Sequence, residues 1–202
     1  MNIIFDLDGT LIDSKQRLYQ LFQRLVPAST LTFDQYWQFK HNRLSNELIL
    51  STEFGYAYLE IQHFVSAWMG LIESPEFLAM DSNFEGVKDT LSRLGSHARL
   101  HVCTARQSRE SAVTQLESLG LSNYFESLMV TEQKHSKTSI IERQVSDLAP
   151  EDWLIGDTGS DIKVAHSLGI NSCAVLSGFM SHEALLTYKP TRIIDSVLAF
   201  VL

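Results

Sequence analysis

Short apolar runs and apolar stripes at helical spacing alternate along most of the chain. Each run predicts a strand buried on both faces, and the runs occupy residues 3–5, 100–103, 127–130, 153–155, 172–176 and 192–194. The stripes, spaced three and four residues apart, predict helices at residues 87–94, 108–119, 138–145, 162–168 and 181–188. This order of strands and helices predicts an α/β fold built on a doubly wound parallel sheet.

Residues 14–82 interrupt the alternation with an aromatic-rich stretch that has helical spacing and few strand signals. Helices are predicted there at residues 18–25, 33–39, 47–53 and 58–71. Aromatic side chains in such a stretch are typical of the core of a small helical bundle. The chain is therefore predicted to contain an α/β core domain, residues 1–13 and 83–202, and an inserted α-helical cap domain, residues 14–82.

Composition and charge narrow the range of partners. Hydrophobic residues make up 45% of the chain and charged residues 20%, as in ordinary folded proteins. The net charge of −8 argues against nucleic acid or an anionic membrane as a general partner. No apolar run approaches the ~20 residues that span a bilayer, and no basic leader precedes the first strand. Cys103 and Cys173 lie in predicted strands, which favours buried free thiols and a cytoplasmic location.

Two carboxylates follow the first predicted strand directly. Asp6 and Asp8 lie two residues apart, so an extended backbone would project both to one side. Gly9 then allows a sharp turn without a Cβ penalty. A simple turn would also explain so short a motif, so its interpretation depends on polar residues elsewhere in the chain.

Further polar residues follow the other predicted strands. Thr104 ends the second strand, Lys137 comes after the third, and Asp157 and Asp161 come after the fourth. The carboxyl ends of parallel strands share one edge of the sheet, where ligands bind near the reversal of strand order. Carboxylates gathered there with one hydroxyl and one ammonium group suit Mg²⁺, which shares its coordination sites with substrate phosphate. The pattern indicates phosphoryl transfer on a small phosphorylated metabolite.

With these motifs the chain resembles the haloacid dehalogenase (HAD)-like hydrolase superfamily, in its phosphoglycolate phosphatase/β-phosphoglucomutase-like branch. The first motif matches at Asp6-Leu7-Asp8-Gly9-Thr10. Thr104 matches the second motif, Lys137 the third, and the stretch from Gly156 to Asp161 the fourth. The resemblance covers nearly the whole chain and implies a Rossmann-like HAD core with a helical cap inserted after the first motif.

The resemblance also implies catalytic roles. Asp6 would be the nucleophile, Asp8 the general acid and base, and Thr104, Ala105 and Lys137 the phosphate ligands. Physical chemistry agrees, because a carboxylate that attacks a phosphate dianion needs positive charge nearby. The departing alkoxide needs a proton, and the water that later hydrolyses the aspartyl phosphate must lose one. A second carboxyl group next to the nucleophile can carry out both proton transfers.

The metal site follows from the same resemblance. Asp6, Asp157, Asp161 and the backbone carbonyl of Asp8 would hold Mg²⁺. Dehalogenases proper lack the second aspartate of the first motif, so Asp8 favours phosphate chemistry.

Two lysines compete for the third motif. Lys134 and Lys137 both follow the third strand, and Lys137 is preferred because Ser136 and Thr138 place it at a helix start, where backbone amides can also face phosphate.

Three basic residues have open roles. Arg106 could contact substrate or lie at the surface. The cluster from Lys40 to Arg43 is either a solvated turn or a cap loop in which Lys40 and Arg43 bind the leaving group of the substrate.

The predicted function is a Mg²⁺-dependent phosphatase that hydrolyses a small phosphate monoester through an aspartyl-phosphate intermediate. One alternative is a phosphomutase of the β-phosphoglucomutase type, which returns the phosphoryl group to a sugar. Another is a phospho-acceptor signalling module, against which Asp8 and the long cap argue. The presence of all four motifs argues against a binding protein with an inactive site.

Overall fold

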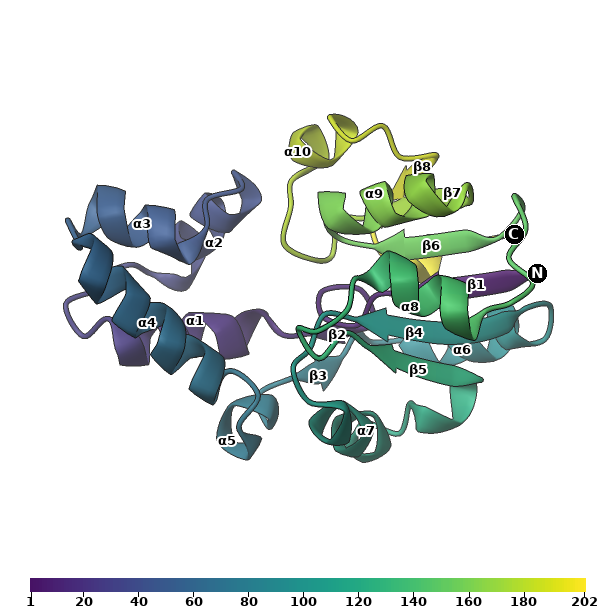
Figure 1. The fold of residues 1–202 in the computed structure, drawn as a ribbon, viewed down its shortest axis with the longest axis horizontal. Helices are drawn as coiled ribbons and strands as arrows, with labels where there is room; N and C mark the ends of the chain where they lie inside the picture. The colour runs from purple at the N-terminus through teal and green to yellow at the C-terminus, as the bar shows by residue number, and fades with distance from the viewer.

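A computed structural model of the protein describes all 202 residues and contains one six-stranded sheet and one two-stranded ribbon (Figure 1). The strands are β1 (Asn2–Phe5), β2 (Ile12–Asp13), β3 (Ser82–Asn83), β4 (Arg99–Thr104), β5 (Ser127–Val130), β6 (Trp153–Gly156), β7 (Asn171–Val175) and β8 (Arg192–Ile194). The helices are α1 (Lys15–Leu25), α2 (Phe33–His41), α3 (Asn46–Glu53), α4 (Tyr58–Leu71), α5 (Pro75–Leu78), α6 (Val87–Gly95), α7 (Arg109–Ser118), α8 (Lys137–Gln144), α9 (Gly159–Leu168) and α10 (His182–Leu186). Two 3₁₀ helices are η1 (Ser122–Tyr124) and η2 (Val197–Ala199). None of the helices is both long enough and apolar enough to cross a membrane.

The main sheet is parallel throughout, with the strand order β5-β4-β1-β6-β7-β8. After β1 the chain builds outward through β4 and β5, then returns to the other side of β1 with β6. Strand order therefore reverses beside β1, where Phe5 pairs with Val102 of β4 and Ile155 of β6. The predicted doubly wound α/β fold is confirmed.

Helices cover both faces of the sheet because its inner strands are apolar on both sides. On one face, Phe5 and Val102 pack with apolar residues of α6, α7 and η2. On the other, Ile4 and Cys103 pack with residues of α8 and α9, which cross in front of the sheet in Figure 1. Cys103 and Cys173 are both free and buried, as predicted.

Helices α1 to α5 form a separate helical lobe at one end of the molecule (Figure 1). Its core is aromatic: Phe22 packs against Tyr36, with ring centroids 4.9 Å apart, and against Phe64. The two chain crossings between the lobe and the α/β core pair with each other as the antiparallel strands β2 and β3. This ribbon and the short helix α5 were not predicted, because so few residues carry no periodic pattern.

Candidate active site

A cavity of about 290 Å³ lies at the carboxyl edge of the sheet and is lined by residues of both the α/β core and the helical lobe. The predicted residues that line it are Asp6, Asp8, Thr104, Ala105, Lys137 and Asp157. They come from the ends of β1, β4 and β6 and from the start of α8. Parallel strands thus bring together side chains that are far apart in the sequence.

Lys137 joins two of the predicted carboxylates. Its Nζ donates to Asp6 Oδ1 at 2.7 Å and to Asp161 Oδ1 at 2.6 Å. Lys137 is the first residue of α8, whose N-terminus is capped by the side chain of Ser136. Lys134 is exposed and lines a neighbouring hollow instead of the cavity. Of the two candidate lysines, only Lys137 therefore reaches Asp6.

Burial and neighbouring charges set the pKa values around Lys137. Burial raises the pKa of Asp6 to about 7, although Lys137 opposes the shift. Burial by itself would lower the pKa of Lys137, but Asp161 and Asp6 raise it above its ordinary value. Lys137 therefore remains an ammonium ion in this setting, whereas buried Asp6 needs positive charge nearby to remain ionised.

Asp157 has a buried oxygen without a partner. Its Oδ2 accepts a hydrogen bond of 2.7 Å from the backbone N–H of Phe179, whereas Oδ1 has no hydrogen-bond partner. Burial raises the pKa of Asp157 well above its usual range, and the carboxylates of Asp6 and Asp161 raise it further. An unpaired buried carboxylate oxygen is costly unless a cation or a proton satisfies it.

Asp6, Asp157 and Asp161 form a carboxylate cluster in which one oxygen of each lies within 4.8 Å of the others. The single ammonium group of Lys137 leaves this cluster with an excess of negative charge. Asp161 is also engaged by Thr158, whose backbone N–H and hydroxyl donate to Oδ2 at 3.1 and 2.6 Å. The oxygen donors fit Mg²⁺, and Asp6 and the unpaired oxygen of Asp157 are the donors best placed to hold it.

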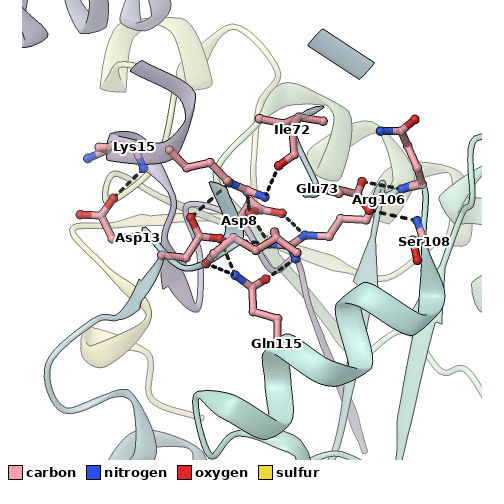
Figure 2. A network of polar contacts seen from close by, with 12 residues as sticks. Asp8, Asp13, Lys15, Ile72, Glu73, Arg106, Ser108 and Gln115 are labelled. Atoms are coloured by element: carbon pink, nitrogen blue, oxygen red, sulfur yellow. Dashed lines mark hydrogen bonds and ion pairs between the residues drawn. The ribbon is translucent and has the colours of Figure 1, made fainter. Parts of the chain in front are cut away.

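Asp8 is held by two buried arginines instead of joining the carboxylate cluster (Figure 2). Arg106 donates from Nε to Oδ2 at 2.9 Å and from Nη2 to Oδ1 at 2.8 Å, and Arg17 donates from Nη2 to Oδ1. Arg17 and Arg106 are only 3% and 5% exposed. Burial would raise the pKa of Asp8, but the two guanidinium groups hold it well below its usual range.

A second carboxylate, Asp81, supports the two arginines from the other side. Arg17 Nε lies 3.1 Å from Asp81 Oδ1, and Arg106 Nη2 lies 3.4 Å from Asp81 Oδ2. Gln115 on α7 donates to Asp81 at 2.6 Å and accepts from Arg106 (Figure 2). Burial raises the pKa of Asp81 to about 6, opposed by Arg17. Arg106 is thus not the surface residue considered as an alternative from sequence.

Lys40 and Arg43 do not line the cavity. Lys40 Nζ donates to Asn46 Oδ1 at 3.3 Å. Arg43 donates to the backbone oxygen of Ala184 and the hydroxyl of Thr187, and so ties the lobe to α10. In this arrangement neither residue contacts Asp6, whose ion-pair partner is Lys137.

Several residues that line the cavity were not predicted from the sequence. The sequence pattern could have indicated Arg17, because it lies four residues before Leu21 on the apolar face of α1. A buried arginine requires a partner of opposite charge. Glu73 accepts hydrogen bonds from the backbone N–H groups of Gln107 at 2.7 Å and Ser108 at 3.0 Å, and no local pattern indicates it. Gln133 likewise has no sequence signal; it adopts a φ of 56° and donates to the carbonyl of Ala105 at 2.6 Å.

Comparisons with known proteins place this geometry in a family. Residues 3–175 match the model of the haloacid dehalogenase-like hydrolases. The chain is 25% identical over 193 residues to a phosphoglycolate phosphatase of Aquifex aeolicus, covering 88% of this chain and 85% of the relative. It is 21% identical over 207 residues to phosphoglycolate phosphatase 1 of Pseudomonas aeruginosa, covering 96% of this chain and 76% of the relative.

Solved structures show the same fold. A haloacid dehalogenase-like family hydrolase of Streptococcus pneumoniae superposes with a TM-score of 0.79 at 24% identity, covering 98% of this chain and 94% of that one. The resemblance inferred from the four motifs is confirmed by the family match, which spans all of them. The chain is therefore an enzyme of the haloacid dehalogenase-like hydrolase family.

Proposed function

We propose that the protein is a Mg²⁺-dependent phosphatase that hydrolyses a small phosphate monoester through an aspartyl phosphate on Asp6. The observation that carries this proposal is the position of Asp6, which contacts Lys137 at 2.7 Å and shares the carboxylate cluster with Asp157. The cavity of about 290 Å³ suits a small substrate. In this proposal residues 14–82 act as the cap domain over a core made of residues 1–13 and 83–202.

The chain's own residues have distinct tasks in the first step. Asp6 attacks the phosphorus atom, while Lys137 binds phosphoryl oxygens with its ammonium group. Thr104 and Ala105 also line the cavity, and the Thr104 hydroxyl and the backbone at Ala105 orient the phosphoryl group. When bound by Asp6, Asp157, Asp161 and the backbone carbonyl of Asp8, Mg²⁺ supplies positive charge against the repulsion between carboxylate and phosphate.

Asp8 handles protons in both steps of the proposed reaction. It gives a proton to the leaving oxygen and later takes one from the water that hydrolyses the aspartyl phosphate. Arg17 and Arg106 engage both of its oxygens in this structure. The two guanidinium groups keep Asp8 ionised, so Asp8 has to turn away from them and take up a proton from solvent before it can protonate the leaving oxygen.

The test is phosphate release from a panel of monoesters with and without Mg²⁺. The relatives named as phosphoglycolate phosphatases make 2-phosphoglycolate the first ester to assay. Failure to release phosphate from every ester in the presence of Mg²⁺ would contradict the proposal. Conversion of a sugar 1-phosphate into its 6-phosphate would support the phosphomutase, and a phosphorylated protein that persists for hours would support the signalling module.

A further inference from the structure

The guanidinium groups of Arg17 and Arg106, called here the arginine pair, already bind a carboxylate in the wall of the cavity. That carboxylate is Asp8, which accepts two hydrogen bonds from Arg106 and one from Arg17. The two bonds from Arg106 run side by side, at 2.9 and 2.8 Å, in the bidentate geometry that arginine forms with carboxylates. The pair is nearly inaccessible to bulk water, yet both arginines line the cavity, and 18% of the Asp8 side chain is exposed.

The arginine pair needs an anion on its cavity side at all times. Arginine keeps its charge in proteins, and a buried charge that loses its partner is strongly unfavourable. Asp81 is the other carboxylate in contact with the pair, and it is too buried to face the cavity. If Asp8 turns toward a leaving oxygen, as the proposed reaction requires, Asp81 is the carboxylate left in contact with the two guanidinium groups. Glu73 also lines the cavity, but its oxygens already accept hydrogen bonds from the backbone N–H groups of Gln107 and Ser108. Another anion must then fill the vacated place.

Other cations near the cavity are not available for such an anion. Lys137 is committed to Asp6 and Asp161, and by the proposed function to the phosphoryl group. Lys40 and Arg43 lie outside the cavity. The arginine pair is therefore the cationic group best placed to meet a charge on the part of the substrate that leaves.

We infer that Arg17 and Arg106 form a carboxylate-binding site, filled here by the chain's own Asp8, and that a carboxylate on the leaving group of the substrate takes Asp8's place. The inference rests on the proposed phosphatase function and names its substrate class as phosphate monoesters of small hydroxy acids. Exchange of one carboxylate for another keeps the charge of the arginine pair balanced. It also frees Asp8 only when the correct leaving group has arrived, so selectivity appears in kcat/KM.

The experiment compares two esters that differ only in the charged group. These are 2-phosphoglycolate and 2-hydroxyethyl phosphate, in which a CH₂OH group replaces the carboxylate. The wild-type enzyme should prefer the carboxylate by about 10- to 100-fold in kcat/KM, the value expected for charge-assisted hydrogen bonds. Arg106→Gln and Arg17→Gln should each bring this ratio close to one. Arg106→Lys, which keeps the charge and loses the bidentate geometry, should give an intermediate ratio.

Arg24→Gln is the matched control, because Arg24 is an exposed arginine of α1 that pairs with Glu76 at 2.8 Å. The ratio of kcat/KM values for the two esters should be the same in Arg24→Gln as in the wild type. A wild-type ratio near one would overturn the inference, even if the buried variants fail to fold. So would equal losses on both esters in the two Gln variants, since the arginines would then only position Asp8.

A binding measurement separates this inference from the proposed function. Glycolate, the carboxylated leaving group alone, should raise the melting temperature of the wild type and of Arg24→Gln, and should raise that of Arg106→Lys by less. If no ester is hydrolysed, the phosphatase proposal fails while the carboxylate site remains testable with glycolate. If glycolate protects all three proteins equally, or none of them, the carboxylate site is wrong.

Discussion

The backbone N–H of Phe179 donates a hydrogen bond of 2.7 Å to Oδ2 of Asp157, a member of the carboxylate cluster. The ring of Phe179 stacks on Trp37 of the helical lobe, with centroids 5.4 Å apart and planes 23° from parallel. One residue thus touches both a candidate metal ligand and the lobe. This contact is possible because Gly178 lets the backbone pass directly against Asp157, where any Cβ would overlap the carboxylate.

Gly178→Ala should disturb the metal site through this contact. The added methyl group must displace either the Asp157 side chain or the loop, and such overpacking typically costs about 1–3 kcal/mol. We expect a lower melting temperature and a smaller stabilisation by Mg²⁺, both measured by calorimetry. Gly70→Ala on α4 is the control, because a Cβ there meets no atom within 4 Å. Normal stabilisation by Mg²⁺ in Gly178→Ala would show that the close approach is unimportant for Asp157.

Mg²⁺ itself should stabilise the folded protein, because it relieves repulsion among Asp6, Asp157 and Asp161. At a concentration 100 times its dissociation constant, the gain would be about 2.7 kcal/mol in the free energy of unfolding. Removal of divalent ions with a chelator should abolish both this gain and phosphate release. Asp157→Asn should lose most of the gain while Lys163→Gln, outside the cluster, keeps it. Equal stabilisation of both variants would place the metal elsewhere.

Asp6→Asn should lower turnover by several orders of magnitude, because a neutral amide cannot form the covalent phosphoenzyme. The variant should still fold, since the amide oxygen can accept the hydrogen bond from Lys137. Phosphate release and phosphorylation of the protein at quenched time points check this outcome. A variant that retains wild-type turnover would exclude Asp6 as the nucleophile.

Asp8→Asn should slow kcat/KM for esters with basic leaving groups by roughly 10²–10⁴, because the proton donor is lost. The loss should be smaller for p-nitrophenyl phosphate, whose leaving group needs no proton. Kinetics over a series of leaving groups with different pKa values would measure the difference. A loss that is the same for every leaving group would assign Asp8 to binding or to structure.

Lys40→Met should stabilise the protein at neutral pH. Burial lowers the pKa of Lys40 from 10.5 to about 8, although Glu47 opposes the shift. Between these two pH values the unfolded chain binds the proton more tightly, so the free energy of unfolding of the wild type rises with pH there. The Met variant should be more stable by about 1–3 kcal/mol at pH 7, and the gap should close toward pH 10.5.

Chemical denaturation of both proteins at several pH values measures this gap. Lys134→Met is the control, because Lys134 is exposed and its removal relieves no burial of a charged group. A gap that is independent of pH would mean that Lys40 acts through packing and not through its charge.

Much of the fold was readable from local pattern alone. The predicted strands and main helices fall within three residues of the observed bounds, because burial on both faces of the sheet leaves few alternatives for these segments. The gathering of Asp6, Thr104 and Lys137 followed from a single rule, that parallel strands end at one edge of the sheet. Lys137 was preferred over Lys134 from its helix start, and its contact with Asp6 agrees with that choice.

Only tertiary structure decided which residues surround Asp8 and which groups Lys40 and Arg43 contact. Arg17 is separated from Asp81 by most of the helical lobe, and Arg106 lies still further along the chain, so no sequence spacing links them to Asp8. The sequence left Lys40 and Arg43 as either a solvated turn or substrate ligands, and in the structure they contact Asn46, Ala184 and Thr187 instead of lining the cavity. Periodicity specifies which residues are buried, and the sheet edge specifies where strand ends meet. The partners of each buried charge depend on how segments far apart in the sequence pack together, and this packing leaves no periodic trace in the sequence.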